Sequence, residues 1–195
     1  MLEFSCAGVR VRVSMLFPAM TIVLLTFEES AFVLSCLLAS LLHEAGHALA
    51  MLTVRDRPSR VTVGIFGVRI ERSSERLLPY RAACLVSLGG PLMNAVCATV
   101  LYLLGLPIGA TVHAVLALFN LLPITSLDGG EALYALLCTH LPEERAERIL
   151  RRLSVATVFP LAVIGFCTLF ASGYNVTLLV LCGYLIILLL LKEKH

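Results

Sequence analysis

The chain has no tryptophan and little charge, and the shortage of charge argues against most classes of soluble protein. Only 14% of its 195 residues are charged, whereas 59% are hydrophobic and mean hydropathy is +0.94. Ordinary soluble domains carry about 25% charged residues. The composition is that of a polytopic membrane protein, with room for about six spans of roughly 20 residues and for no separate soluble domain.

Three further absences narrow the class. No basic patch with interleaved aromatic residues is present, so nucleic-acid binding is not expected. The seven cysteines are scattered without a CxxC motif, which argues against a disulfide framework or a cysteine metal site. Residues 1–13 lack the regions of a signal peptide, so the first apolar segment is expected to be a retained span.

Apolar runs bounded by charge predict an all-α polytopic membrane protein with about six transmembrane helices. The predicted spans are residues 13–27, 31–54, 80–104, 108–137, 153–171 and 174–191. Pro123 and the Gly129-Gly130 pair interrupt the fourth span, because proline disfavours continued helix and glycine permits unusual backbone angles. We expect one membrane-embedded domain over residues 1–195, with its core in residues 31–139.

A short β-hairpin is predicted between the second and third spans. Alternating β-branched residues over positions 61–70 flank a glycine-bounded turn. The hairpin is either a plain cytosolic loop or an edge that pairs with an extended substrate.

The positive charges orient the chain. In a six-span arrangement all 15 lysines and arginines fall on one side of the membrane. The positive-inside rule then places both termini in the cytosol, and we expect an integral protein of a bacterial cytoplasmic membrane.

The most informative motif is His43-Glu44-Ala45-Gly46-His47, inside the second span. Two histidines four residues apart lie on one helical face and can bind one metal ion. Glu44 between them is suited to act as general base toward a metal-bound water. The alternative is a pair of structural histidines, but burying these groups in hydrocarbon without partners is costly.

A catalytic zinc ion usually has three protein ligands and a water. Asp128, within the interrupted fourth span, is the candidate third ligand. The alternative is that Asp128 caps the half-helix that begins there, and one carboxylate could do both.

Three other polar residues lie within predicted spans. Asn94 follows the Gly89-Gly90-Pro91 sequence and could bond a substrate backbone, a metal ligand or a neighbouring helix. Asn120 could bind substrate or free carbonyls near the break. His113 is expected to be structural or interfacial.

Together these motifs resemble the site-2 protease family of intramembrane zinc metalloproteases. The resemblance rests on three stretches: the histidine motif, Gly89-Gly90-Pro91 with Asn94, and Asn120, Pro123 and Leu127-Asp128-Gly129-Gly130. It implies that His43, His47 and Asp128 bind zinc, that Glu44 is the general base, and that Asn94 and Asn120 hold an unwound substrate. The implied substrate is a membrane-tethered protein cut in or near a transmembrane segment.

The six-span layout is most similar to the sporulation-factor-processing branch, typified by stage IV sporulation protein FB. Two departures stand out. No CBS domain follows the last span, so ATP-linked regulation is expected to be absent or supplied elsewhere, and Leu121 stands where the family often has proline. An inhibitory or regulatory membrane partner is compatible with the resemblance, which leaves the oligomeric state open.

Two other functions compete with a protease. A zinc-binding membrane transporter would need polar groups along a path through the bilayer, and an inactive relative acting as a binding scaffold would usually lack the glutamate or a ligand. Substitution of Glu44 by glutamine discriminates both from a protease.

Overall fold

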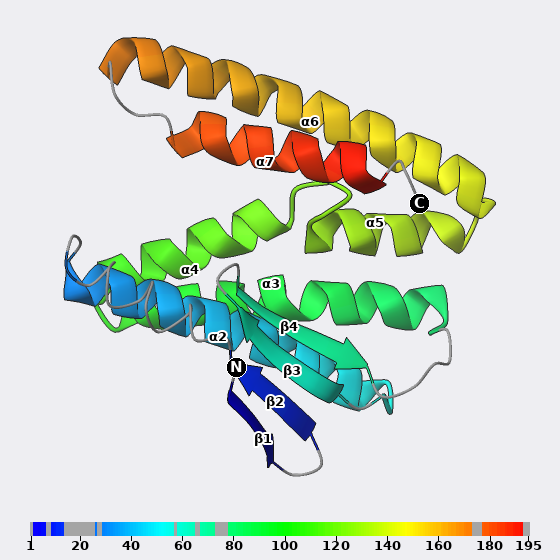
Figure 1. Ribbon diagram of the computed structural model, residues 1–195, viewed down its shortest axis with the longest axis horizontal. Helices are drawn as coiled ribbons and strands as arrows, with labels where there is room; N and C mark the ends of the chain where they lie inside the picture. The colour runs from blue at the N-terminus through cyan, green and yellow to red at the C-terminus, as the bar shows by residue number, and fades with distance from the viewer. Residues whose placement is uncertain are drawn as a thin grey trace. The chain divides into compact units, whose positions relative to one another are not determined.

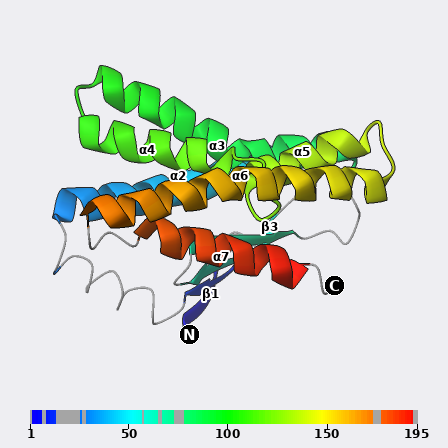
Figure 2. The same cartoon turned by 90° about the horizontal axis from the view of Figure 1, so that it is seen from above.

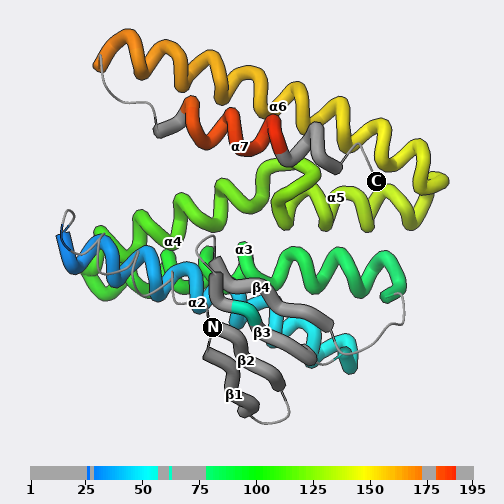
Figure 3. The backbone as a smooth tube through the Cα atoms, in the orientation of Figure 1, coloured from blue at the N-terminus to red at the C-terminus, as the bar shows by residue number. Residues whose placement is uncertain are grey.

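The computed structural model describes residues 2–6, 9–13, 26, 29–56, 58–64, 67–72, 78–172 and 177–192. The chain divides into two compact units, residues 1–120 and 121–195, and each is described by itself. Figure 1 labels the elements and Figure 3 traces the backbone through both units. The expectation of one domain with its core in residues 31–139 stays a prediction.

Three helices and a small sheet make up the first unit. The helices are α2 (Ser30–Thr53), α3 (Tyr80–Leu103) and α4 (Pro107–Asn120). Each of the three packs against the other two. The predicted second and third spans correspond closely to α2 and α3.

The sheet has four strands in the order β1-β2-β3-β4. They are β1 (Leu2–Cys6), β2 (Val9–Val13), β3 (Pro58–Gly64) and β4 (Gly67–Arg72). The predicted hairpin falls on β3 and β4, which pair antiparallel, and β4 contacts α2. Strands β1 and β2 were not predicted from the sequence. Strand β2 pairs parallel with β3, with Val11 opposite Val61, so the sheet joins segments that α2 separates in sequence.

Helices α2 and α3 approach each other closely at two glycines. A Cβ added to Gly46 would collide with the carbonyl oxygen of Gly89, and one added to Gly89 would lie 2.8 Å from the Cβ of Ala50. Small residues allow helix backbones to come together in membranes. The close crossing brings the middle of α2, which carries the histidine motif, directly against α3.

The second unit contains α5 (Asp128–Cys138), α6 (Glu143–Ser172) and α7 (Thr177–Lys192). Helix α6 packs against both of the others, and it runs beside α7 in both views (Figures 1 and 2). The predicted fourth span is not one helix: α4 ends at Asn120 and α5 begins at Asp128, on either side of Pro123. The predicted sixth span corresponds to α7.

Three of the described helices, α2, α3 and α6, are long and apolar enough to cross a membrane. Many large apolar side chains on them are exposed, including Leu103 at 78% and Phe170 at 74%, as expected where lipid rather than water surrounds a helix. Shorter apolar segments are α4 and α7. Most of the predicted first span, residues 13–27, lies outside the described residues, so the count of six spans stays a prediction.

Candidate metal centre

The two motif histidines lie together on one face of α2. Their Nε2 atoms are 3.3 Å apart and their rings are nearly perpendicular, at 83°. Two nitrogens bound at about 2.0–2.1 Å to one tetrahedral zinc ion lie roughly 3.3–3.4 Å from each other. The separation of the two Nε2 atoms therefore fits a shared zinc ion.

A backbone carbonyl orients His47. Its Nδ1 lies 2.7 Å from the carbonyl oxygen of Val86 on α3. A carbonyl oxygen can only accept, so Nδ1 carries the proton and donates it. This hydrogen bond leaves the Nε2 lone pair of His47 available to a metal, the arrangement usual for metal-binding histidines.

A side-chain amide orients His43 instead. Asn94 on α3 places its Nδ2 3.1 Å from Nδ1 of His43, and its Oδ1 lies 3.0 Å from Nδ1 of His113 on α4. His43, Asn94 and His113 are all buried. Side chains from three helices therefore form one hydrogen-bonded chain behind the metal-facing edge of His43.

Gly90 makes room for the imidazoles. A Cβ at this position would collide with Nε2 of His47 and would lie 2.7 Å from Nε2 of His43. Any larger residue would occupy the space in front of the two nitrogens. Gly89, the preceding residue, instead packs against the backbone of α2 at Gly46.

Glu44 lies on α2 beside His43 and is half-buried. It stands in the first position after one proposed ligand and three before the other, the spacing of a general base in a helical zinc motif.

Asp128 begins α5 in the second unit. The residue at the N-cap is Leu127, and no side-chain cap bond is made there. Asp128 is therefore the first residue of the helix, one position after the N-cap. At that position the partial positive charge of the helix N-terminus stabilises an anionic side chain.

The turn before α5 is held tightly against it. A Cβ at Gly129 would collide with the carbonyl oxygen of Leu121, and one at Gly130 would collide with that of Ile124. The hydroxyl of Ser154 on α6 accepts from the Thr125 amide at 3.0 Å and also lies 3.0 Å from the Thr125 hydroxyl. Glycine packing and one buried serine thus fix where Asp128 starts its helix.

The other polar candidates, Asn120 and His113, both lie on α4. The Asn120 side chain donates from Nδ2 to the carbonyl oxygen of Leu116, one turn earlier in α4. His113 was expected to be structural or interfacial, and its contact with Asn94 was not foreseen. The sequence did contain a signal that His113 belongs to the site. His113 is the only acidic or basic residue of α4, and ionisable residues in apolar helices usually mark function.

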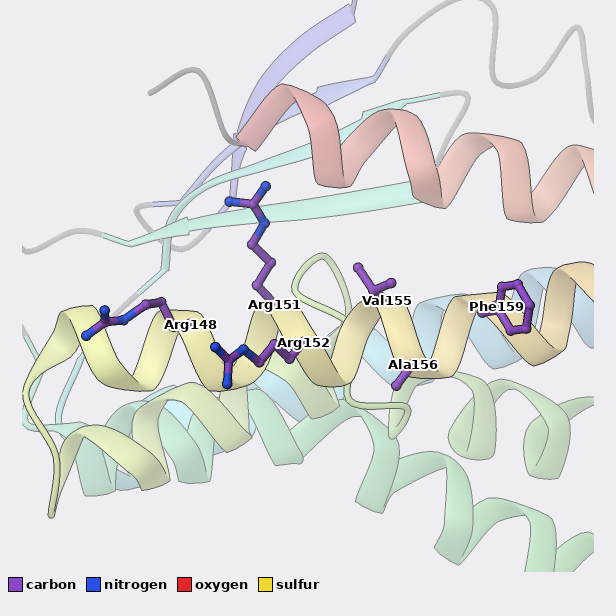
Figure 4. Close-up of a pocket in the computed structure, with 6 residues that line it drawn as sticks. All are labelled: Arg148, Arg151, Arg152, Val155, Ala156 and Phe159. Atoms are coloured by element: carbon purple, nitrogen blue, oxygen red, sulfur yellow. The ribbon is translucent and has the colours of Figure 1, made fainter.

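A separate pocket lies along the first half of α6 (Figure 4). The described residues that line it come from this helix, and they are Arg148, Arg151, Arg152, Val155, Ala156 and Phe159. The arginines precede the apolar residues along the helix. This order is typical of the boundary between a cytosolic surface and a membrane.

Two comparisons with known proteins bear on these residues. Residues 106–161 match the family model described as Peptidase family M50. The matched segment contains Asn120, Pro123 and Asp128 but not the histidine pair. The structure is similar to that of the Site-2 Protease from Methanocaldococcus jannaschii, with a TM-score of 0.66 and 17% sequence identity over 94% of this chain and 91% of that chain.

At this identity the structural likeness shows a shared fold and nothing further. No curated protein matches the chain. The fold and the matched segment together define the class of this protein. It is a membrane protein that has the site-2 protease fold and a peptidase M50 segment.

Proposed function

We propose that the chain is an intramembrane zinc metalloprotease that hydrolyses a peptide bond in or near a transmembrane segment of a membrane-tethered protein. The observation that carries the proposal is the 3.3 Å separation of the His43 and His47 Nε2 atoms, with Glu44 between the two residues. The peptidase M50 match supports it from a different part of the chain.

His43, His47 and Asp128 are the proposed zinc ligands, since each offers one atom of a type that zinc accepts. A bound zinc ion would lower the pKa of a water ligand and polarise the scissile carbonyl. Glu44 takes the proton of the attacking water and returns it to the leaving amine. Asn120, next to the break between α4 and α5, is proposed to hold the unwound substrate backbone.

The proposal also covers the membrane in which the protein lies and its orientation there. The substrate would be cut in regulated intramembrane proteolysis, at the cytosolic side of a bacterial cytoplasmic membrane with both termini in the cytosol. The positive-inside distribution of lysine and arginine supports this orientation. A role in processing a sporulation factor and control by a regulatory membrane partner rest on sequence resemblance alone.

Zinc stoichiometry tests the site. Detergent-purified wild type is expected to hold about one zinc ion, Glu44→Gln to retain it, and Asp128→Ala to lose it, because a catalytic zinc usually needs three protein ligands. Full retention in Asp128→Ala would assign the third ligand to another residue, and a metal-free wild type would make the histidine pair structural.

Cleavage separates a protease from a transporter or scaffold. The probe is a reporter whose single transmembrane segment carries helix-breaking residues near its cytosolic end. Glu44→Gln is expected to lower its cleavage by about 10²–10⁴-fold, the range of general acid–base catalysis. If the wild-type protein binds zinc but leaves the reporter intact, the result would favour the non-proteolytic functions.

A further inference from the structure

Helix α6 has two different faces within the second unit. One face is a buried stripe, and its members are Ala146, Leu150, Ser154 and Val158. Arg148 and Arg152 each stand two positions before a member of that stripe, and residues two apart on an α-helix point about 200° away from each other. The buried face therefore holds the turn before α5, while the pocket in Figure 4 lies on a face turned away from it.

The charged lining of this pocket has one sign. No acidic residue is among the described residues that line it, and its three arginines are exposed. Arg148 donates from Nε to the carbonyl oxygen of Glu144 at 3.2 Å, a bond that does not use the two terminal nitrogens of its guanidinium. Guanidinium groups bind phosphate oxygens through paired N–H donors. The arginine end of the pocket therefore has the chemistry of a phosphate site.

The other end of the pocket is apolar. Val155 is 57% exposed and Phe159 is 70% exposed, and Figure 4 shows the Phe159 ring at the end opposite Arg148. The open pocket has a volume of about 730 Å³, within the range of about 300–1,000 Å³ that is usual for small-molecule sites. A ligand that fills it must carry an anionic part and an apolar part, in that order along α6.

The position of the pocket along α6 indicates the same kind of ligand. Residues 153–171 contain no charged residue and span roughly 28 Å at 1.5 Å per residue, close to the ~30 Å hydrocarbon core of a bilayer. Arg148 then lies roughly 8 Å outside the core along the helix axis, and the polar layer of each leaflet is about 5–8 Å thick. The arginines are therefore at the depth of lipid phosphates, and Phe159 is at the depth of acyl chains.

We propose that this face of α6 binds one anionic phospholipid. The head-group phosphate lies among the guanidinium groups of Arg148, Arg151 and Arg152, and one acyl chain runs along Val155 and Phe159. A zwitterionic phospholipid has the same phosphate, but its ammonium group cancels the negative charge, so the site selects lipids by net charge. The proposal requires that α6 crosses a membrane, and it depends neither on zinc nor on proteolysis.

Native mass spectrometry of the full chain, released from a neutral detergent, tests the selectivity. The probes are phosphatidylglycerol and phosphatidylcholine with identical acyl chains, and the measured quantity is the Kd of the first bound lipid. Phosphatidylglycerol is expected to bind about 100-fold more tightly, which corresponds to roughly fivefold for each of three arginines near an anionic lipid. Equal affinity for the two lipids would overturn the proposal.

A pair of substitutions locates the site. Arg148→Gln combined with Arg152→Gln should weaken phosphatidylglycerol binding by about 25-fold, at roughly fivefold for each arginine. The matched control is Arg145→Gln combined with Arg81→Gln, which removes the same charge from two exposed arginines outside the pocket and should change the Kd by at most about twofold. An equal loss in both pairs would indicate a general attraction to the membrane surface and would overturn the site.

Two further measurements separate lipid binding from other causes of the same loss. Arg148→Lys combined with Arg152→Lys should weaken binding by less than about fivefold, because lysine keeps the charge that attracts phosphate. A loss as large as in the glutamine pair would make charge irrelevant and overturn the proposal.

Inorganic phosphate at millimolar concentration should leave the lipid bound, because it has no acyl chain to lie along Phe159. Displacement of the lipid by phosphate would make the pocket a site for soluble anions and would overturn the lipid assignment. Glu44→Gln should bind the lipid as wild type does, so an inactive protease and a failed lipid site are told apart.

Discussion

The two regions that supply the proposed zinc ligands position them by different means. In the first unit, two long helices cross at glycines, and side chains from α3 and α4 hold the imidazoles. In the second unit, a short helix is held by backbone contacts of Gly129 and Gly130 and by the hydroxyl of Ser154. The long helix α2 carries its histidine pair at a fixed spacing, whereas the position of Asp128 on the short helix α5 depends on the turn that precedes it.

The difference has a physical basis. Residues four apart on a continuous helix share a face wherever the helix lies. The start of α5 has no such internal rule, because α4 stops before Pro123 and the chain must be redirected. Substitutions of the residues that support the ligands should therefore affect metal binding in the first region, and the stability of the turn and of α5 in the second.

The largest effect is expected at Gly90. A Cβ in Gly90→Ala would collide with Nε2 of His47 and crowd Nε2 of His43, so zinc affinity should fall by about 100-fold, the upper end for residues that support a metal ligand. Chelator competition measures it. Gly183→Ala, where an added Cβ meets no atom of the described residues within 4 Å, is the control. Unchanged affinity in Gly90→Ala would mean that the imidazoles lie elsewhere.

A smaller effect is expected at Gly130. The added Cβ of Gly130→Ala would collide with the carbonyl oxygen of Ile124, and overpacking of this kind typically destabilises by about 1–3 kcal/mol. The melting temperature in detergent should drop clearly, whereas Gly183→Ala should change stability by at most about 1 kcal/mol. Equal melting of the two variants would show that the turn does not pack against α5 as described.

The smallest effect is expected at Ser154. Ser154→Ala removes the acceptor of the Thr125 amide and should destabilise by about 1–2 kcal/mol, the cost of a polar group that loses its partner. Ser35→Ala is the matched control, because the Ser35 hydroxyl donates one turn back along its own helix, to the carbonyl oxygen of Ala31. If the two variants lose equal stability, Ser154 has no special role in fixing the turn.

Much of the fold followed from local rules in the sequence. The apolar runs gave α2 and α3 nearly to the residue, and Pro123 with the two glycines gave the break between α4 and α5. Strands β1 and β2 were missed although residues 9–13 alternate valine and arginine. Their place in the sheet depends on parallel pairing with β3, which lies far along the chain.

The candidate site was likewise predicted from the sequence only in part. The spacing of His43, Glu44 and His47 predicted a shared helical face without any structure, because side-chain direction on a helix is periodic. Asn94 was predicted to bond a substrate backbone, a metal ligand or a neighbouring helix, and the structure places both ends of its amide on histidines of neighbouring helices. Its role in substrate binding stays a prediction, as does that of Asn120.

The sequence by itself determined a membrane protein with a helical metal motif and an interrupted apolar segment, because hydropathy and helical periodicity are local properties. Only the tertiary structure decided that Gly90 faces the imidazoles and that Asn94 joins His43 to His113. Those relations depend on how α2, α3 and α4 rotate and cross. Packing between segments far apart in the chain sets that geometry, and no spacing within one segment records it.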